Sequence, residues 1–370
     1  MRSPYTFFIA SLEGGGAQKV VVNLANNLVD LTGHPVHVVL VRKQGVFLKD
    51  LRPEVEVFDL RQRRALRSIF PLVRYFKDYK PAVFCASQDY TNVCAIVAWF
   101  FSGRPCRMVV REDSVVRKPS GNIARFSRES ALELFMRFCY PKACAVVAIS
   151  RGVAKSLVER NICSDEKIHV IGNPVELLPE GVFYNEIDPS PIPLKGPFIC
   201  AIGRLEEVKG FGNLLRAFSR LEDKNLQLVI LGEGKLRGDL ERCSKQLGID
   251  SRVHMPGFVD SPEQVLAKAS LFVLSSRWEG FGNVIVEALS LGVPVVSTDC
   301  PGGPREILYD GLLGHLVPPD DSEALALAIS DALNSPRGTK ESRMSRASDF
   351  SSEKITEKYL RDVLMPVSRG

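Results

Sequence analysis

The sequence lacks any long hydrophobic run. Over its 370 residues, no apolar stretch approaches the roughly 18 residues that a membrane-spanning helix requires. The early apolar segment 5–10 (YTFFIA) is too short for the core of a signal peptide and predicts a buried strand instead. The nine cysteines are odd in number and include no Cys-x-x-Cys pair, which favours reduced thiols over a disulfide framework or a metal site. We therefore expect a cytoplasmic protein.

Several motifs of metal and cofactor sites are also missing. None of the five histidines has metal-ligand spacing to another, and no Asp-x-Asp pattern occurs in a suitable loop. The dinucleotide-binding Gly-x-Gly-x-x-Gly pattern fails because Lys19 stands where its third glycine is required, and there is no phosphate-binding Gly-Lys-Ser/Thr. The sequence thus requires no metal or cofactor and argues weakly against a dehydrogenase. We also expect no nucleic-acid partner.

What the sequence does contain is a regular alternation of apolar strands and amphipathic helices. Its length exceeds one typical core, so two domains are expected. The alternation predicts an α/β fold of two doubly wound, Rossmann-like domains that face each other across a cleft. The predicted strands are 5–10, 35–41, 56–60, 82–87, 106–111, 145–150 and 168–172, then 198–204, 226–234, 252–259, 271–276 and 293–298.

The order of these segments predicts the domain boundaries, and charge is unevenly distributed between the two halves of the chain. We expect an N-terminal domain over 1–172, a proline-rich linker over 173–197, a second domain over 198–348, and a C-terminal helix over 349–370 that packs outside the second domain. Residues 1–180 hold 26 Lys+Arg against 17 Asp+Glu, whereas the remainder holds 22 against 26. This asymmetry suggests that the first domain faces an anionic partner.

The segment 276–297 (SRWEGFGNVIVEALSLGVPVVS) contains two glutamates around a glycine-rich turn. Glu279 lies in the loop after a predicted strand, and Glu287 lies on the first turns of the next helix, whose N-terminus favours an anion. Glu287 could equally serve as a helix-dipole partner or a member of a buried ion pair. The neighbouring Trp278 and Phe281 favour a ligand site.

Three further loops also follow predicted strands. In the loop 203–210 (GRLEEVKG), Arg204 and Lys209 suit a diphosphate, although two intervening glutamates support a solvated, charged loop. The glycines of 13–18 (EGGGAQ) allow the backbone to approach a ligand closely. The loops around Gly232 and over 256–260, with Phe258 and Val259, are placed to shape a nucleotide-base pocket or are ordinary turns.

Taken together, these motifs resemble the retaining glycosyltransferases of family 4, which have the GT-B fold. The resemblance covers nearly the whole chain in the right order. It is closest to the branch that transfers UDP-hexosamines or UDP-hexoses to lipid-linked or polysaccharide acceptors. The matching segments are Glu279-x7-Glu287, 203–210, 14–28 (GGGAQKVVVNLANNL), 170–175 (VIGNPV), 298–308 (TDCPGGPREIL) and 314–329 (GHLVPPDDSEALALAI).

The resemblance implies a role for each matching residue. Arg204 and Lys209 would hold the donor diphosphate and stabilise the leaving group, and Glu279 would bind hydroxyls of the transferred sugar. Glu287 would bind the ribose hydroxyls. Further donor contacts would come from Gly15, Gly16, Phe281, Gly282 and Asn283, together with Gly203, Gly232, Phe258 and Val259 of the loops above.

One departure concerns a histidine that many members of the family place after a strand of the first domain, in contact with the donor sugar. Here the comparable stretch 109–119 reads VVREDSVVRKP and contains none. Arg111, Glu112 and Asp113 are therefore candidates for sugar or acceptor contacts in its place.

Retention without an obvious protein nucleophile implies front-face attack, in which the departing diphosphate takes the acceptor's proton. Glu279 as a covalent nucleophile is the disfavoured variant. Two other functions remain open at this point, a nucleotide-sugar epimerase of the same architecture and a non-catalytic nucleotide-sugar-binding subunit. The loop 203–210 combined with the glutamate pair disfavours both.

The segment 60–80 (LRQRRALRSIFPLVRYFKDYK) interleaves basic and apolar residues. If it is helical, with Pro71 interrupting it, it is typical of a helix at an anionic membrane surface. We therefore expect peripheral membrane contact on the cytoplasmic face. An ordinary amphipathic helix with a buried apolar side is the alternative and fits a soluble polysaccharide acceptor equally well.

Overall fold

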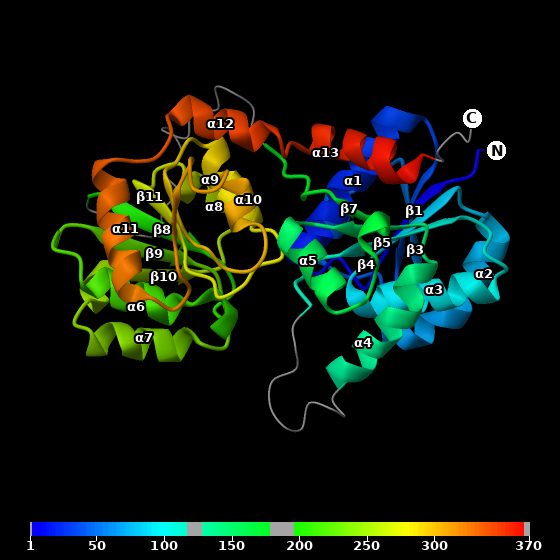
Figure 1. The fold of residues 1–370 in the computed structure, drawn as a ribbon, viewed down its shortest axis with the longest axis horizontal. Coiled ribbons are helices and arrows are strands. Elements are labelled where there is room, and N and C mark those ends of the chain that lie inside the picture. The colour runs from blue at the N-terminus through cyan, green and yellow to red at the C-terminus, as the bar shows by residue number, and fades with distance from the viewer. Residues whose placement is uncertain (1, 117–127, 178–195, 366–370) are drawn as a thin grey trace. The chain divides into compact units, whose positions relative to one another are not determined.

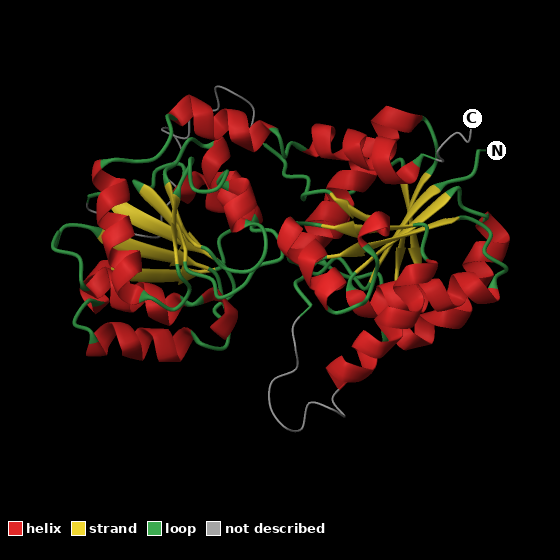
Figure 2. Ribbon diagram, viewed as in Figure 1, coloured by secondary structure: helices red, strands yellow, loops and turns green. Residues whose placement is uncertain are grey.

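The computed structural model describes residues 2–116, 128–177 and 196–365. These residues form two compact units (Figure 1). Unit 1 comprises Met1–Glu176 and Phe350–Gly370, and unit 2 comprises Leu177–Asp349. Each unit is an α/β domain around one parallel sheet (Figure 2), which confirms the predicted class.

Unit 1 is built on a seven-stranded sheet in the order β3-β2-β1-β4-β5-β6-β7, with every neighbouring pair parallel. The central strands are buried along their whole length because helices cover both faces. The strands are β1 (Tyr5–Ile9), β2 (Val36–Leu40), β3 (Val55–Asp59), β4 (Val83–Ser87), β5 (Arg107–Glu112), β6 (Ala145–Ala148) and β7 (Ile168–Val170).

The helices of unit 1 form two layers. Helices α1 and α13 lie on one side of the sheet and α2, α3 and α4 on the other (Figure 1). The helices are α1 (Gly16–Thr32), α2 (Ile69–Tyr79), α3 (Asp89–Phe101), α4 (Arg128–Cys139), α5 (Arg151–Glu159) and α13 (Ser352–Tyr359).

Unit 2 is built on a six-stranded parallel sheet in the order β10-β9-β8-β11-β12-β13. Its core packs the apolar sides of α6 and α11 on the strands, for example through Phe218 and Ile329. The strands are β8 (Phe198–Ile202), β9 (Gln227–Leu231), β10 (Val253–Gly257), β11 (Leu271–Leu274), β12 (Val295–Thr298) and β13 (His315–Val317). The helices are α6 (Phe211–Ser219), α7 (Arg237–Gln246), α8 (Pro262–Leu266), α9 (Asn283–Ser290), α10 (Pro304–Ile307), α11 (Ser322–Asn334) and α12 (Lys340–Ser348).

The placement of the C-terminal helix differs from the prediction. Helix α13 packs against α1 of unit 1, not against the second domain. Two backbone hydrogen bonds at Val175 join the end of the chain to unit 1. The Val175 N–H donates to the Phe350 carbonyl at 2.8 Å, and the Val175 carbonyl accepts from the Ser352 N–H at 3.0 Å. The prediction was wrong because an amphipathic pattern shows that a helix has a buried side but not which core covers that side.

Two other elements also differ from the sequence reading. Pro71 does not interrupt its helix, because it is the third residue of α2, where the backbone N–H would have no helical partner. A 3-10 turn, η2 (Ala65–Ser68), precedes it. Strand β13 was not predicted, since three residues between turns are too short for a periodic signal. Most of the predicted linker 173–197 lies outside the described residues, but Asn173 and Val175 are buried in unit 1.

Candidate functional site

The candidate site of unit 2 lies at the carboxyl edge of its sheet. Because all six strands are parallel, the loops that follow them meet at one edge. The structure thereby brings most of the predicted donor-binding residues to a single edge. They follow β8 (Gly203, Arg204, Lys209), β9 (Gly232), β10 (Phe258, Val259) and β11 (Glu279, Phe281, Gly282, Asn283).

Lys209 and Glu279 form an ion pair at this edge. The Lys209 Nζ lies 2.6 Å from Glu279 Oε1, and both side chains are largely buried. The Ser276 hydroxyl donates to the same carboxylate oxygen at 2.6 Å, and the Glu279 N–H donates to the Pro301 carbonyl at 3.0 Å. A predicted cation and a predicted sugar-binding carboxylate are thus held against each other by fixed partners.

Two glycines make this arrangement possible. A Cβ at Gly203 would lie only 3.2 Å from Cε of Lys209, so the lysine stem passes close over the backbone there. Gly302 has a φ of +135°, and a Cβ on it would overlap the carbonyl oxygen of Glu279. Gly302 was not among the residues singled out from the sequence, although the glycine pair after the last predicted strand is visible in it.

Arg204 behaves differently from Lys209. Its side chain is 75% exposed, against 18% for Lys209, and its guanidinium pairs with Glu206 at 3.3 Å. An exposed pair of this kind contributes little to stability. The Arg204 guanidinium is therefore open to an incoming anion, whereas Lys209 is already engaged.

The N-terminus of α9 supplies the other part of this edge. Gly282 caps the helix with a φ of 102°, which favours glycine, and Asn283 is its first residue. Phe281 is buried in the core, so a ligand at this turn would meet its backbone and not its ring. Glu287 lies on the second turn and is half-buried.

The loop after β9 has an engaged backbone group, and the loop after β10 exposes an aromatic side chain. The Gly232 N–H donates to the Gly257 carbonyl at 2.8 Å, so this N–H is engaged within the unit. Phe258 follows Gly257 and exposes its ring, and Val259 is half-buried. An exposed aromatic ring next to a strand end is a suitable platform for a planar base.

In unit 1, the glycine loop precedes α1. Gly15 caps the helix with a φ of 129°, and Gly16 is its first residue. The loop is held by a second glycine turn, because a Cβ at Gly45 would overlap the backbone of Leu12. Gly45 was missed by the sequence analysis, since a lone glycine after a strand carries no signal of a partner 33 positions away.

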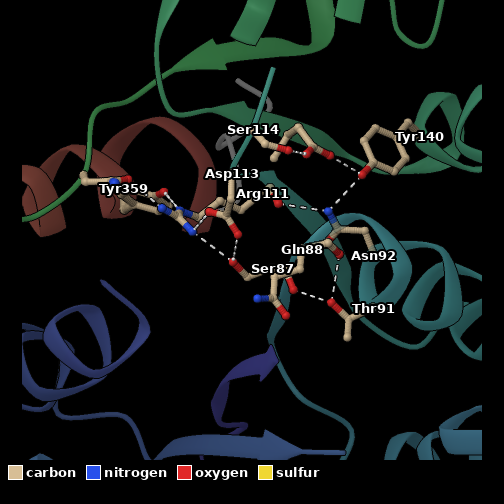
Figure 3. A network of polar contacts seen from close by, with 11 residues as sticks. Ser87, Gln88, Thr91, Asn92, Arg111, Asp113, Ser114, Tyr140 and Tyr359 are labelled. Carbon is tan, nitrogen blue, oxygen red and sulfur yellow. Dashed lines mark hydrogen bonds and ion pairs between the residues drawn. The ribbon is translucent and has the colours of Figure 1, made fainter. Parts of the chain in front are cut away.

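Arg111 is the centre of a buried polar network (Figure 3). It donates to the Tyr359 hydroxyl at 3.1 Å, to Ser87 Oγ at 2.9 Å and to Asn173 Oδ1 at 2.6 Å. It also forms an ion pair with Asp113, whose carboxylate accepts from Ser87 at 2.9 Å. The Arg111 charge is therefore fully engaged inside unit 1.

Glu112 points into a second group of polar side chains. The Tyr140 hydroxyl donates to Glu112 at 2.6 Å and accepts from Asn92 Nδ2 at 2.9 Å (Figure 3). Burial, with the nearby Asp89 charge adding to it, raises the pKa of the Glu112 carboxyl to about 8. Of the three candidates for sugar or acceptor contact, Arg111 and Glu112 are enclosed, and Asp113 alone keeps a partly exposed carboxylate. Direct contact by these residues stays a prediction.

The described residues show neither a membrane-spanning helix nor a metal-binding cluster. Among residues 2–116, 128–177 and 196–365, no helix is long and apolar enough to cross a membrane. In the same part of the chain, no group of three or more His, Cys, Asp and Glu residues could hold a metal ion.

Comparison with known proteins gives consistent matches. The family model of the Glycosyltransferase Family 4 matches residues 14–177, and that of the Glycosyl transferases group 1 matches residues 183–349. Two transferases of Campylobacter jejuni align with almost the whole chain. The first is the N-acetylgalactosamine-N,N'-diacetylbacillosaminyl-diphospho-undecaprenol 4-alpha-N-acetylgalactosaminyltransferase, 29% identical over 96% of this chain and 98% of its own. The second is the GalNAc-alpha-(1->4)-GalNAc-alpha-(1->3)-diNAcBac-PP-undecaprenol alpha-1,4-N-acetyl-D-galactosaminyltransferase, 30% identical over 96% of this chain and 97% of its own.

Solved structures show the same fold. Anabaena HepE in complex with UDP and glucose superposes with a TM-score of 0.79 at 21% identity, over 97% of this chain and 99% of its own. The lipopolysaccharide outer core galactosyltransferase WaaB superposes with a TM-score of 0.74 at 20% identity, over 97% and 98%. These relatives give the epimerase alternative no support. With its two parallel-sheet units and its matches along nearly the whole length, the chain belongs to the family 4 glycosyltransferases of GT-B fold.

Proposed function

We propose that this glycosyltransferase moves a hexose or N-acetylhexosamine from a UDP-sugar to a lipid-linked acceptor, with retention of configuration at the anomeric carbon. The observation that carries the proposal is the Lys209–Glu279 pair at the carboxyl edge of unit 2, next to Gly203 and the N-terminus of α9. A lysine ammonium, a carboxylate and a helix N-terminus suit the charges and hydroxyls of a nucleotide sugar. The two Campylobacter relatives support a lipid-linked acceptor, because their names specify diphospho-undecaprenol carriers.

The proposed roles follow from what each group can reach. Lys209 and Arg204 stabilise the negative charge that develops on the leaving UDP, which is electrostatic catalysis of the oxyanion-hole type. Glu279 accepts hydrogen bonds from the hydroxyls of the transferred sugar. The acceptor hydroxyl attacks from the side of the departing diphosphate and gives its proton to it. Since two side-chain cations already serve the diphosphate, we propose that the reaction uses no metal or cofactor.

The remaining donor contacts are proposed for the same edge. Glu287 accepts hydrogen bonds from the ribose hydroxyls, Phe258 stacks on the base, and Asn283 meets the phosphate through its backbone. The exposed Phe258 ring and the half-buried Glu287 side chain support these roles. In unit 1, the backbone at Gly15 and Gly16 approaches the donor diphosphate.

We also propose that the protein acts at the cytoplasmic face of a membrane, where it makes peripheral contact with anionic lipid. The predicted segment 60–80 supports this, because Leu66 and Phe70 are exposed among arginines and do not enter the core. Leu72 and Phe76 of the same segment are buried, so part of its apolar side does serve the core.

The experiment is a transfer assay with a panel of UDP-sugars and an undecaprenyl-diphosphate-linked glycan. Mass spectrometry of the product identifies the transferred sugar, and NMR of the anomeric proton reports the configuration. Transfer of one sugar with retention supports the proposal. An epimerised nucleotide sugar, or binding of UDP-sugar without turnover on any acceptor, would contradict it.

The role of Glu287 has its own test. Glu287→Gln keeps the shape and removes the charge, so the variant should bind UDP-sugar more weakly than the parent. A 2′-deoxyribose donor should lose less affinity in the variant than in the parent, because the hydroxyl's partner is already weakened. Equal losses in the two proteins, measured by calorimetric titration, would assign Glu287 to the structural role.

A further inference from the structure

Helix α4 exposes a large apolar side, although its other side, with Met136 and Cys139, is buried in unit 1. Glu133 is buried and forms ion pairs with Arg160 and, at 2.6 Å, with Arg137. On the opposite side, Leu134, Phe135 and Phe138 are exposed at fractions between 53% and 65%. A helix on the surface of a globular protein normally turns its apolar side inward and its charges outward. The outward apolar side of α4 therefore requires an explanation outside the core of unit 1.

The exposed apolar side of α4 belongs to a layer of three helices that all expose apolar residues. Helices α2, α3 and α4 pack side by side in one layer of unit 1 (Figure 1). The other two helices also expose large apolar residues, with Phe70 of α2 85% exposed and Phe101 of α3 68% exposed. We call this surface the three-helix face, defined by Leu66, Phe70, Phe101, Leu134, Phe135 and Phe138.

The charge of the three-helix face is strongly positive. Exposed arginines and lysines lie directly before η2 (Arg63, Arg64), on η2 (Arg67), on α2 (Arg74, Lys77) and directly after α3 (Arg104). Among the described side chains of η2, α2, α3 and α4, Asp78 is the one carboxylate classed as exposed, at 54%, and it pairs with Arg74 at 3.5 Å. A surface that carries both basic and apolar side chains is complementary to a bilayer, because the basic groups match anionic headgroups and the apolar groups match acyl chains.

We propose that the three-helix face lies on an anionic bilayer, with Leu134, Phe135 and Phe138 of α4 entering the acyl boundary and the arginines of η2 and α2 contacting phosphate headgroups. The inference deepens the proposed function, since a lipid-linked acceptor keeps its tail in the membrane. It adds α4, which the sequence pattern of residues 60–80 does not include. It also assigns separate parts, insertion to α4 and headgroup contact to η2 and α2.

The first test is flotation of the purified full chain with vesicles, in the absence of nucleotide sugar and acceptor. Vesicles contain phosphatidylcholine alone or mixed with phosphatidylglycerol. The parent should bind the anionic vesicles, and added salt should weaken that binding. Leu134→Ser/Phe135→Ser/Phe138→Ser should lower binding at least about tenfold. Arg63→Gln/Arg64→Gln/Arg67→Gln should lower it roughly a hundredfold, because each basic residue near an anionic surface contributes on the order of a factor of five.

Matched variants in unit 2 control for lost apolar surface and lost charge. Tyr309→Ser/Leu312→Ser/Leu327→Ser removes three similarly exposed apolar side chains, and Arg216→Gln/Arg220→Gln/Arg242→Gln removes three exposed arginines. Both should bind vesicles as the parent does. Thermal unfolding of every variant checks that a loss of binding is not a loss of fold.

A second measurement tests insertion independently of charge. A tryptophan at Phe135 (Phe135→Trp) should be quenched by lipids brominated in the acyl chain, and a tryptophan at Leu327 (Leu327→Trp) should not. If Phe135→Trp is not quenched, or if neutral and anionic vesicles bind the parent equally, the proposal is wrong. A change in oligomeric state of the α4 variant, with vesicle binding intact, would assign the face to contact between copies of the chain and also overturn the proposal.

The experiments distinguish a failure of this inference from a failure of the proposed function. The vesicle experiments contain no substrate, so they give the same result whether or not the chain transfers sugar. If both proposals hold, the α4 variant keeps its turnover on a short-chain acceptor in solution and loses turnover on a long-chain acceptor in vesicles. If the parent floats with anionic vesicles but transfers no sugar, the proposed function is wrong and the membrane inference still holds.

Discussion

Lys209 combines two tasks that usually fall to different residues. It neutralises the Glu279 carboxylate at 2.6 Å, and it supplies a cation where the donor diphosphate is proposed to bind. Without the lysine, a largely buried carboxylate would stand next to the phosphates and repel them. Arg204, exposed and paired with a glutamate at 3.3 Å, has only the second task.

This division predicts different phenotypes for the two cations. Lys209→Met should lower kcat/KM by roughly a hundredfold or more. It should also destabilise unit 2 by about 1–3 kcal/mol, because Glu279 loses its partner. Arg204→Gln should lower kcat/KM without changing the unfolding midpoint. Steady-state kinetics and thermal unfolding of both variants check this.

A double variant separates the two effects of Lys209. Lys209→Met/Glu279→Gln should recover the stability of the parent, since no unpaired charge remains, and should stay inactive. Unchanged stability in the single Lys209→Met variant would show that the ion pair has no structural task.

The buried Glu112 carboxyl should make the free energy of unfolding of unit 1 depend on pH. Its pKa is raised from 4.5 to about 8 in the folded chain by burial. Between these two values the folded state binds a proton that the unfolded state has released, so the free energy of unfolding falls as pH rises, by up to about 1.4 kcal/mol per pH unit. Glu112→Gln cannot ionise and keeps an acceptor for Tyr140.

The variant should therefore match the parent near pH 4.5 and become progressively more stable than the parent up to about pH 8. Above that value the difference should stay constant. Unfolding midpoints of both proteins across this range provide the measurement. A difference that does not vary with pH would show that Glu112 is not protonated in the folded chain.

At the residue scale, positions after strands predicted that Lys209 and Glu279 lie at the edge of a sheet, but their ion pair was not predicted. The sequence could not identify the partners of Arg111. Tyr359 is 248 positions away along the chain, and its contact depends on where a helix packs. Local pattern carries no information about such a distant pairing.

At the scale of elements, the strands could be predicted from the sequence more readily than the loops that carry the site. Each predicted strand is present, because buried β-branched runs of this length have few alternative structures. The loops were harder to predict, since their shape depends on glycines whose neighbours lie in other loops. Gly302 is the clearest case, because its missing Cβ leaves room for the backbone of Glu279.

Gly302→Ala should displace the loop that carries Glu279. The added Cβ overlaps the Glu279 carbonyl, and a φ of +135° strains any other residue by about 1–3 kcal/mol. We expect weaker UDP binding and lower turnover together with reduced stability. Calorimetric titration with UDP and thermal unfolding give the two values.

Gly248→Ala is the matched control. Gly248 also has a positive φ, +66°, but a Cβ there would meet nothing within 4 Å. This variant should lose some stability and keep its UDP affinity. Equal UDP affinity in both variants would mean that Gly302 does not position the loop.

At the scale of the whole molecule, the chain forms unit 1 from two separate segments. Residues after Asp349 return to it, with Lys358 Nζ donating to the Val170 carbonyl at 3.0 Å and Arg107 Nε donating to the Val363 carbonyl at 2.7 Å. Composition and periodicity predicted two domains but assigned the last helix to the nearer one in sequence. The assignment failed because the hydrogen bonds that decide it join residues far apart along the chain.

Tyr359→Phe should test this return. The substitution removes the acceptor of Arg111 Nε and leaves that donor buried, which costs about 1–3 kcal/mol. Hydrogen exchange should then be faster at the amides of β5 and unchanged at those of β8. Unit 2 should bind UDP with the affinity of the parent. Faster exchange in β8 would show that the segment stabilises both units.

The return of the chain to unit 1 also has a consequence for synthesis on the ribosome. Residues 177–349 emerge before Ser352–Tyr359, so unit 2 has its full sequence while Arg111 still lacks the Tyr359 hydroxyl and α1 lacks the helix that packs on it. Domains of nascent chains generally fold as units, with the N-terminal one first. Here that order is reversed, because unit 1, whose first segment is translated before unit 2, is the last to be completed.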